Sequence, residues 1–106
     1  MKTFNEILEA AKPFLNAMEY RRNATFPSDD FEVVVVLEKG RKYNRIVTDT
    51  RNKKTGKMFE QRSCGGFIDN EGNVYKSASW KAPAKKIRAN IFNNNCTNTL
   101  SHDGYI

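Results

Sequence analysis

Residues 72–92 read GNVYKSASWKAPAKKIRANIF and contain five Lys or Arg residues, no Asp or Glu, and the only tryptophan of the chain. The residue types predict a tight turn, a strand over residues 74–78, a junction that carries Trp80, and a short basic helix over residues 83–92. Pro83 favours the helix, because proline suits the first helical position, where an N–H would have no intrahelical partner. We expect the rest of the chain to hold this basic segment against a sheet.

Three more strands are predicted upstream, and the connections between them are short enough to be hairpins. Residues 31–38 read FEVVVVLE, and this run of valines indicates a strand buried on both faces, either central in the sheet or covered by a helix. The third strand, residues 58–68, contains Gly65-Gly66, which indicates a bulge or a close approach of another group to the backbone. The sheet is therefore predicted as a four-stranded antiparallel meander over residues 31–78.

An N-terminal helix is predicted over residues 3–21. Thr3 and Glu6 fit a capping box, and apolar residues then recur three or four positions apart. The apolar stripe stays in phase across Pro13, so we expect one helix with a kink at the proline, where a backbone hydrogen bond is lost. The stripe favours packing against a core over lying on a membrane, because the polar face has no strong basic bias.

These elements predict one α+β domain over residues 1–106: a kinked N-terminal helix on a four-stranded antiparallel meander, a short basic C-terminal helix, and an irregular tail over residues 93–106. A chain of this length can bury one modest core. No segment approaches the about 20 apolar residues that a membrane span needs, and no signal peptide is recognisable. A cytosolic, reducing environment is therefore expected, in which Cys64 and Cys96 stay free thiols.

The sequence shows no constellation of catalytic or metal-binding residues. The single histidine, His102, lies in the predicted tail beside Asp103, and neither cysteine belongs to a C-x-x-C pair. No phosphate-binding loop, dinucleotide-binding fingerprint or pair of catalytic carboxylates is recognisable. We therefore expect a protein without enzymatic activity, metal or cofactor.

Positive charge is concentrated in two segments of a chain whose net charge is +6 at pH 7. Residues 39–62 hold nine cations and two anions, and residues 76–90 hold five cations and no anion. Such a distribution suits an anionic partner such as nucleic acid. The alternative is a domain whose Lys-rich turns and edges only keep it in solution.

Aromatic residues interleave with Lys and Arg in the second of these segments, as they do in grooves that bind single-stranded nucleic acid. In such grooves bases stack on the rings, each stack worth roughly 1–3 kcal/mol, while the cations follow the phosphates. The predicted nucleic-acid surface comprises Tyr75, Lys76, Trp80, Lys81, Lys85, Lys86 and Arg88. A second basic patch would comprise Arg41, Lys42, Arg45, Lys53 and Lys54. A single Trp at such a junction can also be a core or lid residue with lysines in solvent around it.

The motif VYKSASWKAPAKKIRANI within this basic segment resembles one in a group of small uncharacterised bacteriophage proteins, where G-x-x-Y-K precedes A-S-W-K-x-P-A-K and N-I. The likeness extends over about residues 40–92 and includes Arg45-Ile46-Val47 and Gln61-Arg62-Ser63. The resemblance implies an origin in a phage or prophage and a place in the cytoplasm of a bacterial host. It implies no particular activity.

The leading hypothesis is a small non-enzymatic phage accessory protein that binds nucleic acid, as a single strand or by shape rather than by sequence. One alternative is a host-interaction protein that inhibits a bacterial enzyme or defence factor by protein–protein binding. Another is an oligomer that captures a small anionic nucleotide between protomers. The salt dependence of binding distinguishes nucleic-acid binding from protein binding. The affinity for nucleic acid falls log-linearly with salt concentration, whereas a protein contact anchored by apolar hot spots weakens much less.

Overall fold

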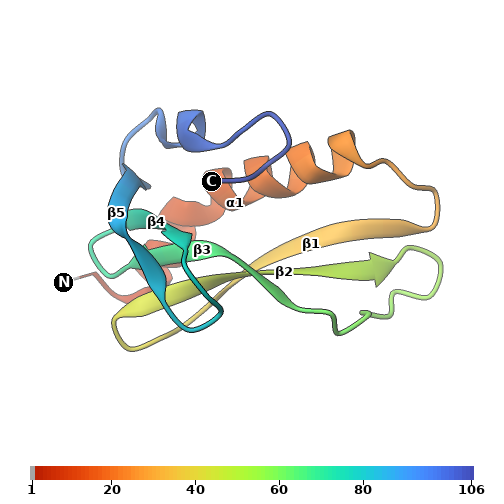
Figure 1. The fold of residues 1–106 in the computed structure, drawn as a ribbon, viewed down its shortest axis with the longest axis horizontal. Helices are drawn as coiled ribbons and strands as arrows, with labels where there is room; N and C mark the ends of the chain where they lie inside the picture. Colours follow the sequence, from red (N-terminus) through yellow and green to blue (C-terminus); the bar gives the residue numbers. More distant parts are fainter. Residues whose placement is uncertain (1) are drawn as a thin grey trace.

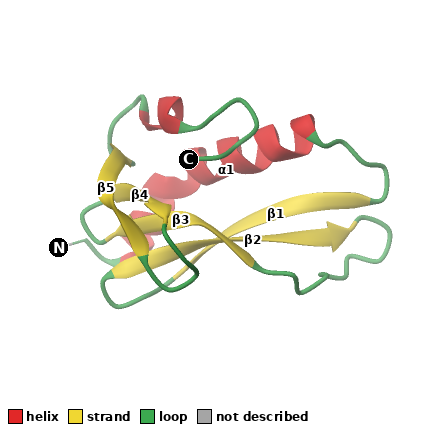
Figure 2. Ribbon diagram, in the orientation of Figure 1, coloured by secondary structure: helices red, strands yellow, loops and turns green. Residues whose placement is uncertain are grey.

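The computed structural model describes residues 2–106 as one long helix and a five-stranded antiparallel sheet (Figure 1, Figure 2). In chain order the elements are α1 (Phe4–Thr25), β1 (Phe31–Glu38), β2 (Tyr43–Asn52), β3 (Ser63–Asp69), β4 (Asn73–Ser77), β5 (Pro83–Asn90) and the short 3-10 helix η1 (Cys96–Thr99). The strands lie side by side in the order in which they occur in the chain. The predicted α+β class and the antiparallel meander are confirmed, with five strands in place of the expected four.

The helix α1 begins and packs as its sequence pattern predicts, and it runs four residues further than expected. Thr3 and Glu6 form the capping box, in which the Thr3 hydroxyl accepts from the Glu6 amide at 3.2 Å. The apolar stripe becomes the buried face, which includes Ile7, Phe14 and Met18, each with no exposed surface. The helix continues through Pro13, which lies on the exposed side, where water can satisfy the carbonyl that proline leaves without a partner.

The first strand lies at an edge of the sheet, and only one of its faces is covered. Val35 and Leu37 face α1 and are each 9% exposed, whereas Val36 on the opposite face is 48% exposed. The prediction that both faces of this strand are buried is therefore wrong. The alternative that the same prediction allowed, a strand covered by the helix, is confirmed. The preference of valine for strands accounts for four consecutive valines in a strand with one exposed face.

Side chains of α1 also satisfy the outer edge of β1, where no further strand pairs. The Asn23 side chain accepts a hydrogen bond from Val33 N at 2.7 Å and donates one to Val33 O at 3.0 Å. Glu19 accepts a hydrogen bond from Val35 N at 2.8 Å. The helix therefore closes this edge as well as one face of the sheet.

The Gly65-Gly66 pair forms the predicted bulge. The pairing of β2 with β3 shifts between Ile46↔Gly66 and Val47↔Cys64, so Gly65 has no partner of its own across the ladder. A Cβ on Gly66 would lie 2.8 Å from Tyr75 O, and the φ of Gly66 is +146°. Both a bulge and a close approach to the backbone are thus confirmed here.

The predicted basic helix over residues 83–92 is wrong, because Pro83–Asn90 is the fifth strand, β5. Its apolar residues are spaced as on a helix, but a strand with bulges accommodates them equally well, and pairing with β4 is irregular at two places. The neighbouring strand supplies hydrogen bonds that a short helix would have to make alone. Pro83 fits the edge of a sheet, where a missing N–H is tolerated.

The C-terminal residues pack against α1 and do not extend into solvent (Figure 1). Ile91, Cys96 and Leu100 are buried in the core, and Arg21 Nη1 donates to Leu100 O at 3.1 Å. Leu100 therefore anchors the C-terminal segment to the core, and both cysteines are free thiols.

Candidate nucleic-acid interface

The basic segment forms an antiparallel ribbon of β4 and β5, joined by a tight loop over residues 78–82. In this loop the amides of Ala78 and Ser79 both donate to Ala82 O, at 3.0 and 3.1 Å. β5 has a strand neighbour on one side only, so the ribbon is the second edge of the sheet. Three cations of the basic segment, Lys85, Lys86 and Arg88, lie within β5 and therefore on this edge.

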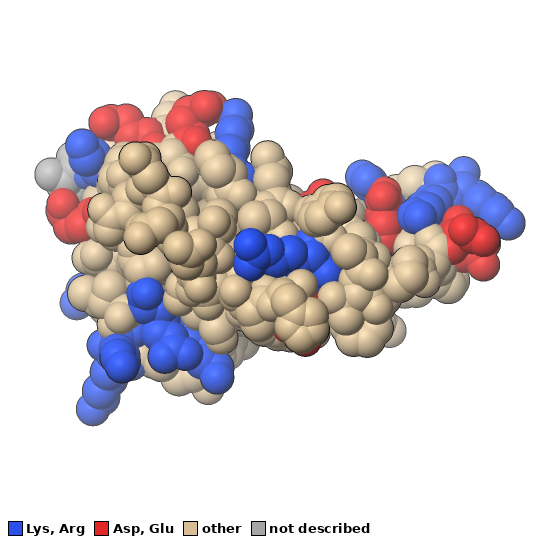
Figure 3. Space-filling model, turned by 90° about the horizontal axis from the view of Figure 1, so that it is seen from above, with Lys and Arg blue, Asp and Glu red and all other residues tan. Residues whose placement is uncertain are grey.

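The cations of the ribbon are exposed and have no carboxylate partners. These cations are Lys76, Lys81, Lys85, Lys86 and Arg88, and none of them forms an ion pair within residues 2–106. Figure 3 shows Lys and Arg gathered without Asp or Glu at the lower left, at the end of the molecule that carries β5 in Figure 1. This end can therefore offer several uncompensated positive charges to an anion.

Lys76 lies on the α1 side of β4, whereas Lys81 belongs to the loop, and Lys85, Lys86 and Arg88 belong to the edge strand β5. Val74 is fully buried on the α1 side of β4, and residues two apart on a strand share a face. Lys76 accordingly lines a pocket on the helix side together with Arg22 and Tyr105. The predicted surface is thus divided between the ribbon edge and this pocket.

Tyr75 lies on the opposite, outer face of the sheet and is half-buried. Its ring meets the ring of Tyr43 edge to face, with centroids 5.4 Å apart, and its hydroxyl donates to Asp69 Oδ2 at 2.9 Å. Burial and this hydrogen bond raise the pKa of Tyr75 to about 12. Tyr75 is therefore fixed in an aromatic cluster rather than presented as a free stacking platform.

Asp69 is the acceptor that holds the turn between β3 and β4. Its carboxylate also accepts from the amides of Glu71 and Asn73, both at 2.9 Å. Burial raises the pKa of Asp69, but these hydrogen bonds and those from the Asn73 and Tyr75 side chains outweigh it, so that the pKa lies below its ordinary value of 3.8. The carboxylate thus stays charged near neutral pH and anchors the start of the ribbon.

The indole of Trp80 is stacked with arginines of its own chain. The Arg45 guanidinium lies 4.2 Å from the ring centroid and Arg62 lies 5.3 Å from it, while Arg45 Nε donates to Trp80 O at 2.8 Å. Glu38 pairs with both arginines. Arg45 also lies over the ring of Phe67, which is only 2% exposed although it is on the outer face. This arrangement favours the lid interpretation of Trp80.

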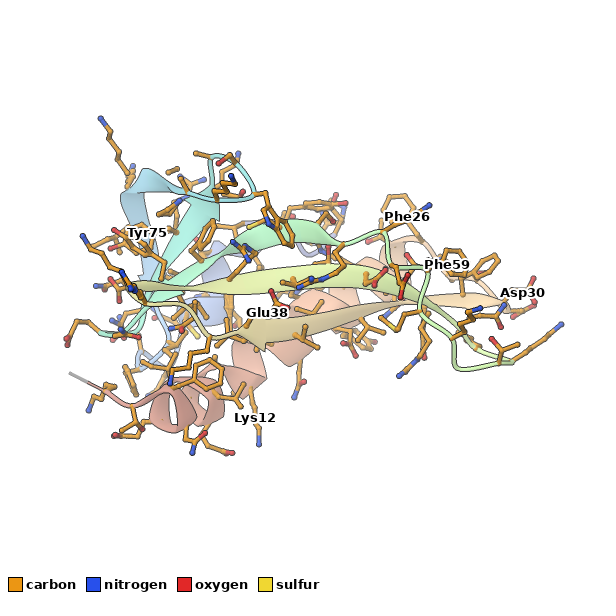
Figure 4. The ribbon with its side chains drawn as sticks, turned by 90° about the horizontal axis from the view of Figure 1, so that it is seen from below. Lys12, Phe26, Asp30, Glu38, Phe59 and Tyr75 are labelled. Atoms are coloured by element: carbon orange, nitrogen blue, oxygen red, sulfur yellow. The ribbon has the colours of Figure 1, made fainter. Side chains whose placement is uncertain are left out.

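The second basic patch is not brought together. Arg41 and Lys42 precede β2, whereas Lys53 and Lys54 follow it, and the ten residues of β2 separate its ends by about 30 Å. In Figure 4 Asp30 and Phe59 mark the end near Lys54, and Tyr75 lies at the other end. Lys53 Nζ donates to Ser28 O at 2.5 Å, and Lys54 pairs with Asp30 at 3.4 Å. Arg45 belongs to the Trp80 cluster instead.

Three residues that sequence reasoning did not select take part in these surfaces. Glu38 and Arg62 are brought to Trp80 by strand pairing, and no local pattern in the sequence signals this. Arg22 is 9% exposed, and its signal was present, because it continues the buried stripe of α1 four residues after Met18.

Within residues 2–106 no three His, Cys, Asp or Glu side chains come together as metal ligands would. None of the helices described for this part of the chain has the length and apolar character needed to cross a membrane.

Comparison with known proteins gives a family but no activity. A family model described as a family of unknown function, DUF7717, matches residues 2–103. No curated protein and no solved structure matches the chain. Because the family model spans nearly all of the sequence, the chain belongs to the DUF7717 family.

Proposed function

We propose that this protein binds nucleic acid through the β4–β5 ribbon, as a small phage accessory protein in the cytoplasm of a bacterial host. The observation that carries the proposal is the set of exposed cations on one sheet edge, none of them ion-paired within the described residues. Cations that face no carboxylate can neutralise phosphates and release counterions without first breaking an internal ion pair. The contacts are with the backbone of the nucleic acid, so sequence preference is weak.

The mode of binding rests on charge more than on stacking. Trp80 and Tyr75, the two predicted platforms, are engaged by Arg45 and by Asp69 respectively. The ribbon itself is a two-stranded antiparallel hairpin, a shape that can enter a groove or run along a single strand. We therefore expect Lys81, Lys85, Lys86 and Arg88 to make the main contacts, with the fold serving to hold them on one edge.

The test is the affinity for a labelled single-stranded oligonucleotide, measured by fluorescence anisotropy at several salt concentrations. The variant Lys85→Ala/Lys86→Ala/Arg88→Ala removes three exposed cations from the ribbon. If each contacts one phosphate, the slope of log K against log salt becomes shallower by about 2, and the affinity at low salt falls at least about tenfold. Circular dichroism checks that the variant is folded.

The matched control is Lys53→Ala/Lys54→Ala/Lys57→Ala, which removes the same charge from the hairpin at the far end of β2. We expect this variant to keep the salt slope of the wild type. Equal losses in the two variants would mean that only net charge matters, and the assignment of the ribbon would be wrong.

A second candidate, binding to a host protein, is favoured by aromatic residues at the end of the molecule opposite the ribbon. Phe26 is 66% exposed, and Phe31 and Phe59 are each 42% exposed with their ring centroids 5.1 Å apart. Neighbouring exposed aromatic rings are typical of protein interaction sites. Failure of the wild type to bind any oligonucleotide at low salt would favour this candidate.

A further inference from the structure

The sheet contains a gap where β3 and β4 diverge. The two strands pair only at Phe67↔Tyr75 and Ile68↔Val74. Before these pairs β3 stays with β2, at Val47↔Cys64, and after them β4 stays with β5, at Ser77↔Pro83. Between the separated strands lies a pocket of about 480 Å³, whose lining includes Arg22, Cys64, Gly65, Lys76, Tyr105 and Ile106. Strand divergence and the C-terminal residues together create this space.

Arg22 enters the pocket from α1 in a fixed position. Its side chain is 9% exposed, its Nε donates to Gly104 O at 3.1 Å, and its guanidinium lies 4.1 Å from the ring centroid of Tyr105. The Nη atoms donate to no group among residues 2–106, and no buried side-chain nitrogen in this range lacks a partner. The Nη atoms are therefore accessible to solvent, and Arg22 is among the residues that line the pocket. Burial lowers the pKa of Arg22, yet the guanidinium remains charged at neutral pH.

Lys76 supplies a second cation to the lining, from β4. No Asp or Glu side chain lines the pocket. Asp103, whose charge acts on Arg22, lies outside the lining and accepts from the Ser101 hydroxyl. Arg22 and Lys76 thus line the same space, and no Asp or Glu side chain of residues 2–106 lines it with them.

We propose that this pocket binds a small anion that carries a phosphate group, up to the size of a mononucleotide. A guanidinium fork matches two phosphate oxygens, and the contact with Tyr105 orients the fork before the ligand arrives. Lys76 adds a point charge, and the volume falls within the range of small-molecule sites. The site lies within one chain and uses none of the three β5 cations, so it is independent of strand binding by the ribbon.

The experiment is a titration of the ¹⁵N-labelled protein with inorganic phosphate and with adenosine monophosphate, at constant ionic strength. Saturable shifts are expected for the amides of Cys64, Gly65, Ser77 and Ile106, with β5 amides unchanged. Equal affinity for the two probes identifies the phosphate alone as the ligand, and at least about tenfold tighter binding of the nucleotide identifies a nucleoside phosphate. No saturable shift up to about 10 mM of either probe would overturn the proposal.

Two variants locate the site without relying on the buried arginine. Lys76→Ala removes an exposed side chain that makes no hydrogen bond within residues 2–106, and it should weaken phosphate binding about tenfold. Lys81→Ala, which removes the same charge from the neighbouring loop outside the lining, should leave the affinity unchanged. Equal affinity of the Lys76→Ala variant and the wild type would refute the assignment. Because Lys85, Lys86 and Arg88 are intact in both variants, failure here is distinguishable from failure of the ribbon.

Discussion

The two edges of the sheet differ in charge and in what the fold places beside them: β1 reads FEVVVVLE and β5 reads PAKKIRAN. At the β1 edge α1 satisfies the backbone, since Asn23 and Glu19 hydrogen-bond Val33 and Val35. At the β5 edge no further strand pairs within residues 2–106, and the exposed side chains of β5 include Lys85, Lys86 and Arg88. One edge is thus closed by hydrogen bonds. The other is left open and charged, which prevents pairing with further strands and also suits an anionic ligand.

The same difference extends to the cations. Glu32 lies directly across the ladder from Arg51 and pairs with it, and Asp30 pairs with Lys54. Within residues 2–106 the only strand beside β5 is β4, which reads NVYKS and contains no acid. Strand register, rather than the number of Lys and Arg residues, therefore determines which positive charges are available for a ligand.

The largest expected loss of stability comes from truncating an aromatic residue at each end of the molecule, Trp80 beside the ribbon and Phe59 at the opposite end. Trp80→Ala removes a ring stacked on two arginines, one of which lies over Phe67, so the free energy of unfolding should fall by about 2–3 kcal/mol. Phe59→Ala loses one edge-to-face contact with Phe31 and should cost about 1 kcal/mol. Urea denaturation measures both.

Oligonucleotide binding separates a lid from a platform at Trp80. If the indole only covers the sheet, Trp80→Ala should bind within about twofold of the wild type under conditions in which the variant is folded. A stacking platform would instead lose roughly 1–3 kcal/mol of binding free energy. A large loss of affinity with unchanged stability would show that Trp80 leaves Arg45 to stack on a base.

A smaller effect is expected at the closed edge. Asn23→Ala deletes two hydrogen bonds to Val33 and should lower the free energy of unfolding by about 1–2 kcal/mol. Asn16→Ala is the matched control, because Asn16 is exposed on the same helix and makes no such contact. Hydrogen exchange should show slow exchange at the Val33 and Val35 amides in the wild type and faster exchange at Val33 in the variant. Alanine has a higher helix propensity than asparagine, so Asn16→Ala should not lower the stability, and a loss in Asn23→Ala no larger than in Asn16→Ala would mean that the bonds to Val33 do not close the edge in solution.

The sequence predicts those elements whose partners are near in the chain. The apolar stripe of α1 locates the buried face of the helix, short connections identify the antiparallel meander, and Gly65-Gly66 locates the bulge. The segment over residues 83–90 could not be assigned from its own pattern. The same apolar positions suit a short helix or an irregular strand, and pairing with β4 determines the outcome.

The candidate site was predictable to the same extent. Lysine side chains are charged and are mostly exposed, and Lys81, Lys85 and Lys86 are exposed in the structure. The stacking of Arg62 on Trp80 depends on residues far apart in the chain, and the divergence of β3 from β4 has no sequence motif. The burial of Arg22 was predictable, because a charged residue that continues the apolar stripe of a helix lies on its buried face.

The smallest effect concerns the hydrogen bond by which Asp69 holds Tyr75 at the start of the ribbon. The pKa of Asp69 lies below 3.8, so its contribution to stability is complete above about pH 5 and is lost as the pH falls through the lowered pKa. Asp69→Asn should therefore be less stable than the wild type at pH 7, and the difference should shrink in acid. Thermal unfolding across this pH range measures it. A difference that is constant with pH would show that the charge of Asp69 is immaterial.

The alkaline side tests the same bond from its donor. Because the pKa of Tyr75 is raised from 10.0 to about 12, the native state favours the neutral phenol, and this stabilisation is present below pH 10 and lost as the pH rises toward 12. Tyrosinate absorbance should show one late-titrating tyrosine in the wild type that is missing in Tyr75→Phe and titrates earlier in Asp69→Asn. Within residues 2–106 no comparable carboxylate anchors the other end of β4, and there the loop is held instead by Arg45, which stacks on Trp80 and donates to its carbonyl oxygen. If Tyr75 titrates normally, the anchor that Asp69 provides at the start of the ribbon is absent in solution.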